Sequence, residues 1–309
     1  MAYEIRPMRR DDVPPAFTLI HEVYPCLVLT EDLLFRRFDQ PLAYYRDQRF
    51  VAVEDGAVVG HVLARLHDDD AGTTHGRTYM AAVAPSHLDG DLPEDLLQVA
   101  EKHLIDHGAD TLRADAAQEG VQLGGERFRE AILGQGYELS ESAQILGLEL
   151  ARLPPAPPMP EGVELRTLRE FEDDPRPIYE LDRLTGQDEP GGGGGGFLPY
   201  PEWVRIAWNN PLSDKDISLV LLMDETPVAL SLYVSDGAGR MESGMTGTLR
   251  EYRGRGLAGY TKAKALELAR DKGITHAYTG NHAHNTPMLT INARLGYTVV
   301  GSEETYLEP

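Results

Sequence analysis

The stretch Glu251–Lys262, EYRGRGLAGYTK, places two arginines and three glycines between the extended segment MESGMTGTLR and a helix with apolar spacing. A turn from strand to helix presents N–H groups that have no partner within the helix, together with the positive end of the helix dipole. Gly254 and Gly256 lack the Cβ that would hold an anion away, and Arg253 and Arg255 add positive charge. The sequence therefore predicts a phosphate-binding loop made mostly of backbone.

A dinucleotide-binding turn is the weaker interpretation of these glycines. Gly254, Gly256 and Gly259 do complete the spacing G-x-G-x-x-G. However, the turn does not follow the first strand of either half, and no acidic ribose-binding residue is evident about 20 residues on.

Four segments of the first half recur in the same order in the second half. For example, RFVAVEDGAVVGHVLARL corresponds to SLVLLMDETPVALSLYVSD as strand, tight turn and strand. FREAILGQGYELSESAQILGLEL corresponds to MLTINARLGYTVVGSEETYLEP as a short helix, a Gly-Tyr pair and a closing strand or hairpin. The chain is therefore predicted to be a tandem duplication.

The proline-rich stretch RLPPAPPMPEG divides the two halves, since proline at this density forms a stiff, extended connector. We predict a first domain over residues 1–153, a linker over 154–162 and a second domain over 163–309. Each half mixes strands and helices and includes a strand–helix–strand crossover. The predicted fold class is α/β with a mixed sheet, each domain holding mostly antiparallel strands and one parallel pair.

The formal charge of -21 on 309 residues disfavours nucleic acid and anionic membranes as partners and would attract cationic amines. No apolar run approaches the roughly 20 residues that cross a bilayer, and the N-terminal residues lack the apolar core of a signal peptide. Cys26 is the only cysteine, so no internal disulfide is expected. These features lead us to expect a cytoplasmic protein.

Arg253, Gly256 and Ala258 match the pattern Arg/Gln-x-x-Gly-x-Gly/Ala, and the downstream stretch TGNHAHNTPMLTINARLGY provides a strand, an Asn-containing loop, a short helix and a Gly-aromatic turn. In these residues the second half resembles the GNAT superfamily of N-acetyltransferases. Because the order of elements extends to the first half, the whole chain resembles the tandem-GNAT subgroup that includes mycothiol-synthase-like enzymes. Nothing identifies it as that synthase.

The resemblance implies that acetyl-CoA lies between two splayed parallel strands, one ending near Leu249 and the other near 278–281. A primary amine of a small molecule would attack directly, so that most of the acceleration comes from positioning. The resemblance also implies that the Leu249 N–H polarises the thioester carbonyl. The residues implied to bind the coenzyme are Leu249, Arg253, Gly254, Arg255, Gly256, Leu257, Ala258, Asn281 and Asn285.

The proton-transfer groups are less clear from the sequence. Many members of the family have a tyrosine acid at the position of Asn292, and an amide cannot replace it. Tyr297 is close in sequence but is expected to be a core residue. Glu242, on the strand that leads into the loop, is the candidate base, and an ordinary exposed glutamate is the equal alternative.

Six consecutive glycines precede an aromatic segment in DEPGGGGGGFLPYPEW (188–203), which is either a flexible insertion or a mobile lid over the acceptor. On the lid hypothesis, Asp188, Tyr200 and Trp203 bind the acceptor. His282 and His284 form an H-x-H pair without a third ligand at ordinary spacing, so no metal is expected.

The first half has lost the loop, because VAPSHLDGDL stands where the second half has LREYRGRGLA. Asp89 and Asp91 would repel a pyrophosphate, so we expect no acetyl-CoA there. Two other functions remain open: a non-catalytic acyl-CoA-binding or sensor protein, and nucleic-acid binding through the arginine-glycine turn. The sequence leaves the acceptor amine, the acyl length and the oligomeric state undetermined.

Overall fold

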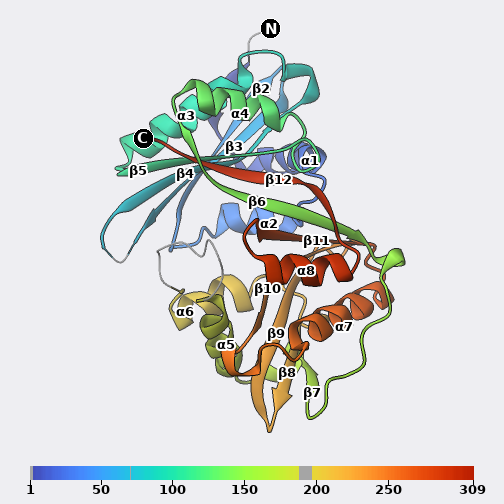
Figure 1. Ribbon diagram of the computed structural model, residues 1–309. Coiled ribbons are helices and arrows are strands. Elements are labelled where there is room, and N and C mark those ends of the chain that lie inside the picture. The colour runs from blue at the N-terminus through green and yellow to red at the C-terminus, as the bar shows by residue number, and fades with distance from the viewer. Residues whose placement is uncertain (1–2, 70, 188–196) are drawn as a thin grey trace. The chain divides into compact units, whose positions relative to one another are not determined.

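The computed structural model describes residues 3–69, 71–187 and 197–309 (Figure 1). The chain divides into two compact units. The first unit comprises Met1–Gln144 and Val300–Pro309, and the second comprises Ile145–Val299. The division thus counts the last ten residues with the first unit, whereas the sequence-based boundary placed them with the second half. That boundary stays a prediction.

The first unit is built around a sheet with strand order β1-β2-β3-β4-β5-β12. Its strands are antiparallel except for the parallel pair of β4 and β5. The elements that contribute to it are β1 (Glu4–Pro7), α1 (Val13–Val23), α2 (Glu31–Asp39), β2 (Arg46–Glu54), β3 (Ala57–Asp68), β4 (Thr74–Val83), α3 (Leu92–Asp106), β5 (Thr111–Ala117), α4 (Gly125–Gly134) and β12 (Thr298–Leu307).

The helices of this unit cover both faces of its sheet. One core joins α3 and α4 to the sheet and is centred on Leu96, Leu104 and Phe128. The other joins α1 and α2 to the opposite face through Ile20 and Leu34. This two-sided burial follows the apolar spacing of each helix, which places one stripe of side chains against the strands.

The second unit repeats the plan with strand order β6-β11-β10-β9-β8-β7. Its pairs are antiparallel from β7 to β10, and β10 pairs in parallel with β11. The elements are β6 (Glu138–Glu149), which crosses the division between the units, β7 (Glu164–Thr167), α5 (Arg176–Gly186), α6 (Tyr200–Trp203), β8 (Leu219–Met223), β9 (Thr226–Ser235), β10 (Arg240–Thr248), α7 (Leu257–Asp271), β11 (His276–His282) and α8 (Thr286–Arg294).

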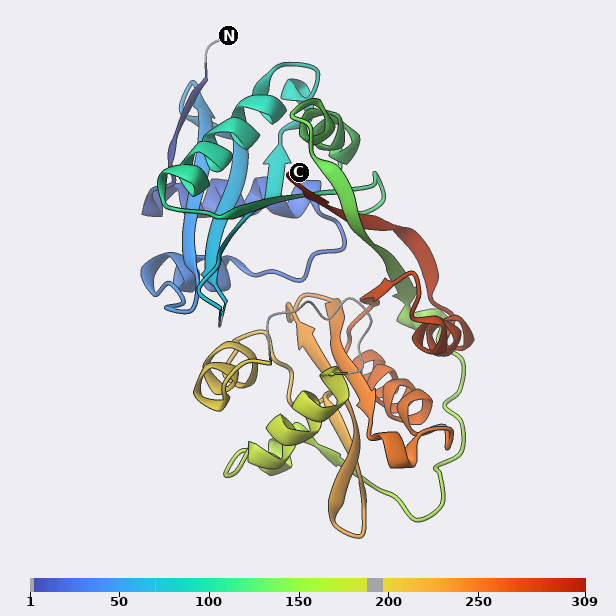
Figure 2. The same ribbon diagram turned by 60° about the vertical axis from the view of Figure 1, so that its left-hand side comes forward.

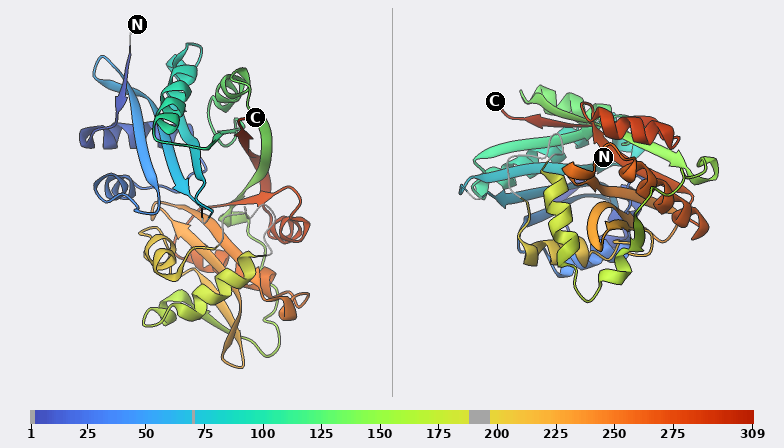
Figure 3. Two further views of the ribbon diagram at one scale, coloured as in Figure 1. Left: turned by 90° about the vertical axis from the view of Figure 1, so that its left-hand side faces the viewer. Right: turned by 60° about the horizontal axis from the view of Figure 1, so that its bottom comes forward.

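Each face of the second sheet is covered by its own hydrophobic core. On one face α7 packs through Ala263, Leu266 and Ala269. On the other, α5 and α6 pack around Trp203 and Leu230. Figure 2 shows α5 and α7 on opposite sides of β8–β10, and the left view of Figure 3 shows α5 and α6 together. The mixed sheet with one parallel pair in each half confirms the predicted fold class.

The proline-rich linker is neither helix nor strand from Leu153 to Val163, apart from a turn at its end, and follows an extended path (Figure 2). The Ala156 N–H donates to Glu267 Oε1 on α7 at 3.1 Å. The linker is therefore attached to the helix that follows the arginine-glycine loop.

Candidate functional site

A pocket of about 1050 Å³ lies within the second unit. Its lining comes from the linker, the end of β10, the loop that follows β10, the first turns of α7, the end of β11, and α8. Three arginines and one lysine contribute to it, namely Arg253, Arg255, Arg294 and Lys262, whereas none of the described lining residues is Asp or Glu. A strongly acidic chain thus keeps this pocket free of carboxylates, which suits an anionic ligand.

A β-bulge opens the sheet at this pocket. On β10 the residues Gly244 and Met245 lie between Ser243, which pairs with Tyr233, and Thr246, which pairs with Ser231. A bulge bends its strand and increases the local twist. The parallel ladder between β10 and β11 ends at the same point, at the pair Ser243 and Thr279. The two strands then separate, as the resemblance implied.

The loop between β10 and α7 has the geometry of an anion cradle. Gly254 and Gly256 have φ angles of 76° and 79°, a region that favours glycine. A Cβ at Gly254, Gly256 or Gly259 would meet no atom within 4 Å, so the space beside the backbone is open. The first helical bond runs from the Tyr260 N–H to Gly256 O at 3.0 Å. The N–H groups of 257–259 therefore have no partner within the helix.

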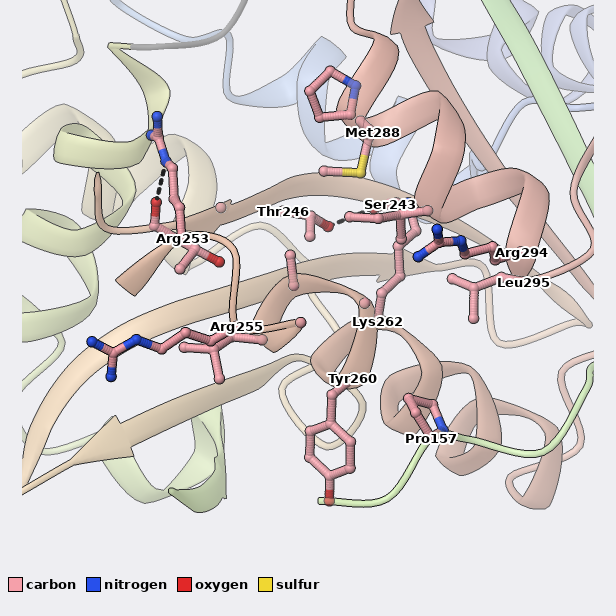
Figure 4. Close-up of a pocket in the computed structure, with 18 of the residues that line it drawn as sticks. Pro157, Ser243, Thr246, Arg253, Arg255, Tyr260, Lys262, Met288, Arg294 and Leu295 are labelled. Atoms are coloured by element: carbon pink, nitrogen blue, oxygen red, sulfur yellow. Dashed lines mark hydrogen bonds between the residues drawn. The ribbon is translucent and has the colours of Figure 1, made fainter. Parts of the chain in front are cut away.

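The two loop arginines play different structural parts. Arg253 Nε donates to Thr248 O at 3.0 Å, which ties the loop back to the end of β10 (Figure 4). The Arg255 guanidinium lies 5.2 Å from the centre of the Tyr252 ring and extends away from the other labelled residues (Figure 4). Arg253 thus fixes the shape of the loop, and Arg255 adds positive charge at its rim.

The role predicted for the Leu249 N–H is wrong. This N–H donates to Val228 O on β9 at 2.9 Å, so it is used by the sheet. The N–H groups of successive residues in a strand point to opposite edges. Since the Leu249 N–H points to β9, the N–H groups of Thr246 and Thr248 face the other, open edge of β10. The contact of Arg253 with Thr248 O lies on that same edge. The register of β9 against β10 decides which N–H groups face the open edge, and this register cannot be read from the sequence.

Thr248 supplies a second sign that the pocket accommodates a ligand. Its Oγ1 is buried and has no hydrogen-bond partner among the described residues. Buried hydroxyls are normally paired, and an unpaired one at a pocket wall is often satisfied by a ligand or by water.

Of three asparagines near α8, two line the pocket. Asn281 on β11 and Asn285 at the start of α8 both do so, as the resemblance implied. Asn285 caps α8 by accepting from the Met288 N–H at 3.3 Å. Asn292 is fully buried, and its Nδ2 donates to Asn281 Oδ1 at 2.5 Å. The residue at the usual acid position thus holds Asn281 in place.

Lys262 is a further pocket residue, on α7, that the sequence analysis did not select. Its side chain is only 1% exposed and extends toward Ser243 and Thr246, where β10 and β11 separate (Figure 4). Its Nζ lies 5.3 Å from the centre of the Tyr297 ring. Burial alone lowers the pKa of the Lys262 ammonium to about 7. A buried amine at the deep end of an anion pocket is a candidate functional group.

Glu242, the candidate base, does not line this pocket. Its neighbours Met241 and Ser243 are buried on the α7 side, so the alternation of the strand directs Glu242 to the α5 side of the sheet. It pairs there with Tyr278 on β11. Glu242 is therefore separated by the sheet from Lys262.

The aromatic lid residues are not part of the pocket. Trp203 is 2% exposed, and its indole N–H donates to Asp182 Oδ2 at 2.7 Å. It stacks on Trp208 with ring centres 5.7 Å apart, and Tyr200 packs at the edge of the same cluster. The structure therefore makes Trp203 a core residue beneath α5. Asp188 lies outside the described residues.

In the first unit a glutamine side chain fills the equivalent opening. The parallel ladder between β4 and β5 ends at the pair Thr78 and Ala114, just as the ladder between β10 and β11 ends at Ser243 and Thr279. Beyond it, Gln122 Nε2 donates to Ala81 O at 2.8 Å, and Gln122 Oε1 accepts from the Ala117 N–H at 2.9 Å. This buried amide bridges the two separating strands.

The N-terminus of α3, beside that opening, also differs from the N-terminus of α7. The first turn of α3 carries Glu94 and Asp95, whereas the first turn of α7 carries no acidic residue. Carboxylates at a helix N-terminus occupy the positive end of its dipole. Gly90, the counterpart of Gly256, does not have a positive φ. The anion cradle is thus present in the second unit and replaced in the first.

Two features of the pocket and one of the first unit were not identified from the sequence. Lys262 lies three residues before Ala265 and four before Leu266. This spacing puts it on the apolar face of the helix, and it is the sequence signal from which its burial could have been predicted. The linker prolines, such as Pro157 beside Tyr260 in Figure 4, indicated stiffness and not a pocket wall. Gln122 had no local signal, since its role depends on two strands distant in sequence.

Among the described residues, no helix is long and apolar enough to cross a membrane, and no group of three or more His, Cys, Asp or Glu residues has a metal-binding arrangement.

Several solved structures share this architecture over the whole chain. A tandem GNAT protein from the clavulanic acid biosynthesis pathway matches with a TM-score of 0.76 and 20% identity, covering 99% of this chain and 98% of its own. A GCN5-related N-acetyltransferase from Sphaerobacter thermophilus matches with a TM-score of 0.71 and 18% identity, covering 99% and 95%. One from Kribbella flavida matches with a TM-score of 0.55 and 18% identity, covering 97% and 95%.

No family model matches the chain, and no curated protein matches its sequence. At these identities the structural likeness establishes the fold. The chain has the tandem GNAT fold, with both halves built on the same plan.

Proposed function

We propose that this chain, which has the tandem GNAT fold of known acetyltransferases, transfers an acetyl group from acetyl-CoA to a primary amine of a small molecule. One observation carries the proposal. In a single pocket of the second unit, an open glycine cradle at a helix N-terminus adjoins the gap between two separating parallel strands. The cradle suits a pyrophosphate, and the gap suits a pantetheine arm.

The length of a pantetheine arm is compatible with this assignment. A pantetheine arm has about thirteen bonds from phosphorus to sulfur, which is the backbone length of between four and five extended residues. An arm that starts at the loop and follows β10 backwards from Thr248 reaches Ser243, where the strands meet. The thioester then lies at the deep end of the pocket, beside the bulge.

The residues of β10 and its neighbours have separate tasks in this proposal. Thr246 and Thr248 donate their edge N–H groups to the arm and to the thioester carbonyl as its oxygen gains charge. Asn281, held by Asn292, orients the arm from the β11 side. Glu242 on the opposite face accepts the proton of the attacking amine, directly or through water.

The experiment that tests the function measures thiol release from acetyl-CoA in the presence of a panel of primary amines, with a dye that reacts with free thiols. The proposal predicts amine-dependent thiol release and a product one acetyl group heavier than the amine. A chain that binds acetyl-CoA tightly but acetylates none of the amines would support the alternative of a non-catalytic acyl-CoA-binding or sensor protein.

We expect one acetyl-CoA to bind per chain, because Gln122 already bridges the strands of the first unit. Isothermal titration calorimetry on the full chain measures this ratio directly. The variant Gln122→Ala should lower the melting temperature, because it leaves the Ala117 N–H and Ala81 O without this partner, but should leave the ratio at one. A ratio of two for the parent would contradict the assignment of the first unit.

A further inference from the structure

We propose that Lys262 is the proton donor for the departing coenzyme A thiolate. This inference rests on the proposed function and assigns the acid that the tyrosine position, Asn292, cannot supply. Three observations on the described residues favour Lys262 in this role: its position at the deep end of the pocket, its burial without a carboxylate partner, and the absence of any carboxyl group among the described residues that line the pocket.

The position follows from the helix and the bulge. Lys262 is five residues beyond the start of α7, so its side chain begins about 7.5 Å inside the helix from the cradle. It extends from there toward Ser243 and Thr246, where an arm held at the cradle would end (Figure 4). The phosphate end and the sulfur end of one ligand would thus both contact α7.

The lysine is buried without an anionic partner. Burial alone lowers the pKa of its ammonium, with no neighbouring carboxylate to offset it, and its Nζ lies 5.3 Å from the centre of the Tyr297 ring. A buried amine without such a partner is costly unless a ligand supplies one. A thiolate at the end of the arm would be that partner.

The other groups near this end of the pocket do not fit the task. Asn292 is an amide bonded to Asn281, and Tyr297, although its hydroxyl is buried and unpaired among the described residues, does not line the pocket. Burial raises the pKa of Tyr297 well above its usual value.

The titratable and charged groups around the lysine come from several elements. Four that line the same pocket or belong to the core beside it are Tyr233 on β9, Tyr297 before β12, Arg294 on α8 and His284 in the loop before α8. None of these is a carboxylate, so none of the four stabilises a permanently charged ammonium. Because burial lowers the pKa of Lys262 to about 7, it can both give up and regain a proton near neutral pH.

The step balances without a further reactant. The amine nitrogen forms a bond to the carbonyl carbon, and the C–S bond breaks with its electron pair on sulfur. Lys262 Nζ–H gives a proton to that sulfur and becomes neutral, and the extra proton of the amine goes to Glu242 or to water. Lys262 then regains its proton from solvent.

The first test compares Lys262→Met with the matched control Lys264→Met. Lys264 is on the same helix, is paired with Glu267 and does not line the pocket. We expect Lys262→Met to lower kcat at least about 50-fold with little change in the Kd of acetyl-CoA, and Lys264→Met to resemble the parent. Lys262→Arg keeps a charge but cannot release its proton at these pH values, so it should not restore kcat.

The pH profile separates proton donation from a structural role. Since the protonated amine is the acid, kcat of the parent should fall as pH rises through the pKa of Lys262. That descending limb should be missing in Lys262→Met. A variant that keeps the limb, or that keeps the kcat of the parent, would overturn the proposal.

A binding measurement keeps the proposal testable even if no amine is acetylated. Calorimetry compares coenzyme A with desulfo-coenzyme A, which lacks the sulfur, at pH 7 and pH 9. Lys262→Met should weaken the binding of coenzyme A about tenfold and leave that of desulfo-coenzyme A unchanged. Equal effects on both ligands would place Lys262 away from the sulfur. Failure of the parent to bind either ligand would overturn the proposed function as well.

An intact-mass measurement after incubation with acetyl-CoA completes the test. The acid role predicts no acetyl group on Lys262. Stable acetylation of Lys262 that is passed on to an amine would make the residue a nucleophile and would contradict the proposal.

Discussion

Replacing Gly256 by glutamate should weaken acetyl-CoA binding at least about 100-fold, which corresponds to about 2.7 kcal/mol. Gly256 has a φ of 79°, and the space where its Cβ would stand is open to the cradle. A glutamate there puts a carboxylate against the pyrophosphate and forces an L side chain into a conformation that it rarely adopts. The Kd from isothermal titration calorimetry measures the effect.

The matched control for this change is Gly237→Glu. Gly237 also has a positive φ, of 66°, and a Cβ added there would also meet nothing within 4 Å, but it lies in the exposed turn between β9 and β10. The Gly237→Glu variant should introduce similar backbone strain but leave the Kd of acetyl-CoA unchanged. If both variants bind as the parent does, the glycine loop does not hold the coenzyme.

Replacing Glu242 by glutamine should lower kcat about 100-fold, because the amide cannot accept the proton of the attacking amine. Since Glu242 points to the α5 side of the sheet, away from the acetyl-CoA pocket, the Kd of acetyl-CoA should stay within about twofold of the parent value. Steady-state kinetics with the best amine of the panel provide the measurement.

Glu164→Gln is the control for this second change. Glu164 lies on β7, at the far edge of the same sheet, and pairs with Arg166 at the surface. Exposed ion pairs of this kind contribute little to stability, so the variant should keep the kcat of the parent. If Glu242→Gln keeps the kcat of the parent, Glu242 is an ordinary strand residue and not the base.

Much of the fold was accessible from the sequence because its signals are local. The helix and strand periods and the glycines that follow α3 and α7 depend on neighbours within about twenty residues. The strand–loop–helix turn at 249–257 is local in the same sense, and it was identified with its positive-φ glycines. The parallel pairing of β10 with β11 then follows from the crossover through α7.

The parts of the site that the sequence does not determine depend on register and on contacts between distant segments. The direction of the Leu249 N–H is fixed by its bond to Val228, which lies twenty-one positions earlier in the chain. Trp203 looked like a lid residue because the glycines precede it, whereas its bond to Asp182 makes it part of the core. Gln122 has its role only because Ala81 and Ala117 lie on strands that separate there.

The most direct measurement of the central claim is a crystal structure of the full chain with acetyl-CoA. We expect pyrophosphate oxygens within hydrogen-bond distance of the N–H groups of residues 254–259, and the arm along the open edge of β10 toward Lys262. Coenzyme bound elsewhere on the chain, or phosphates held by surface arginines with the glycine loop empty, would contradict it.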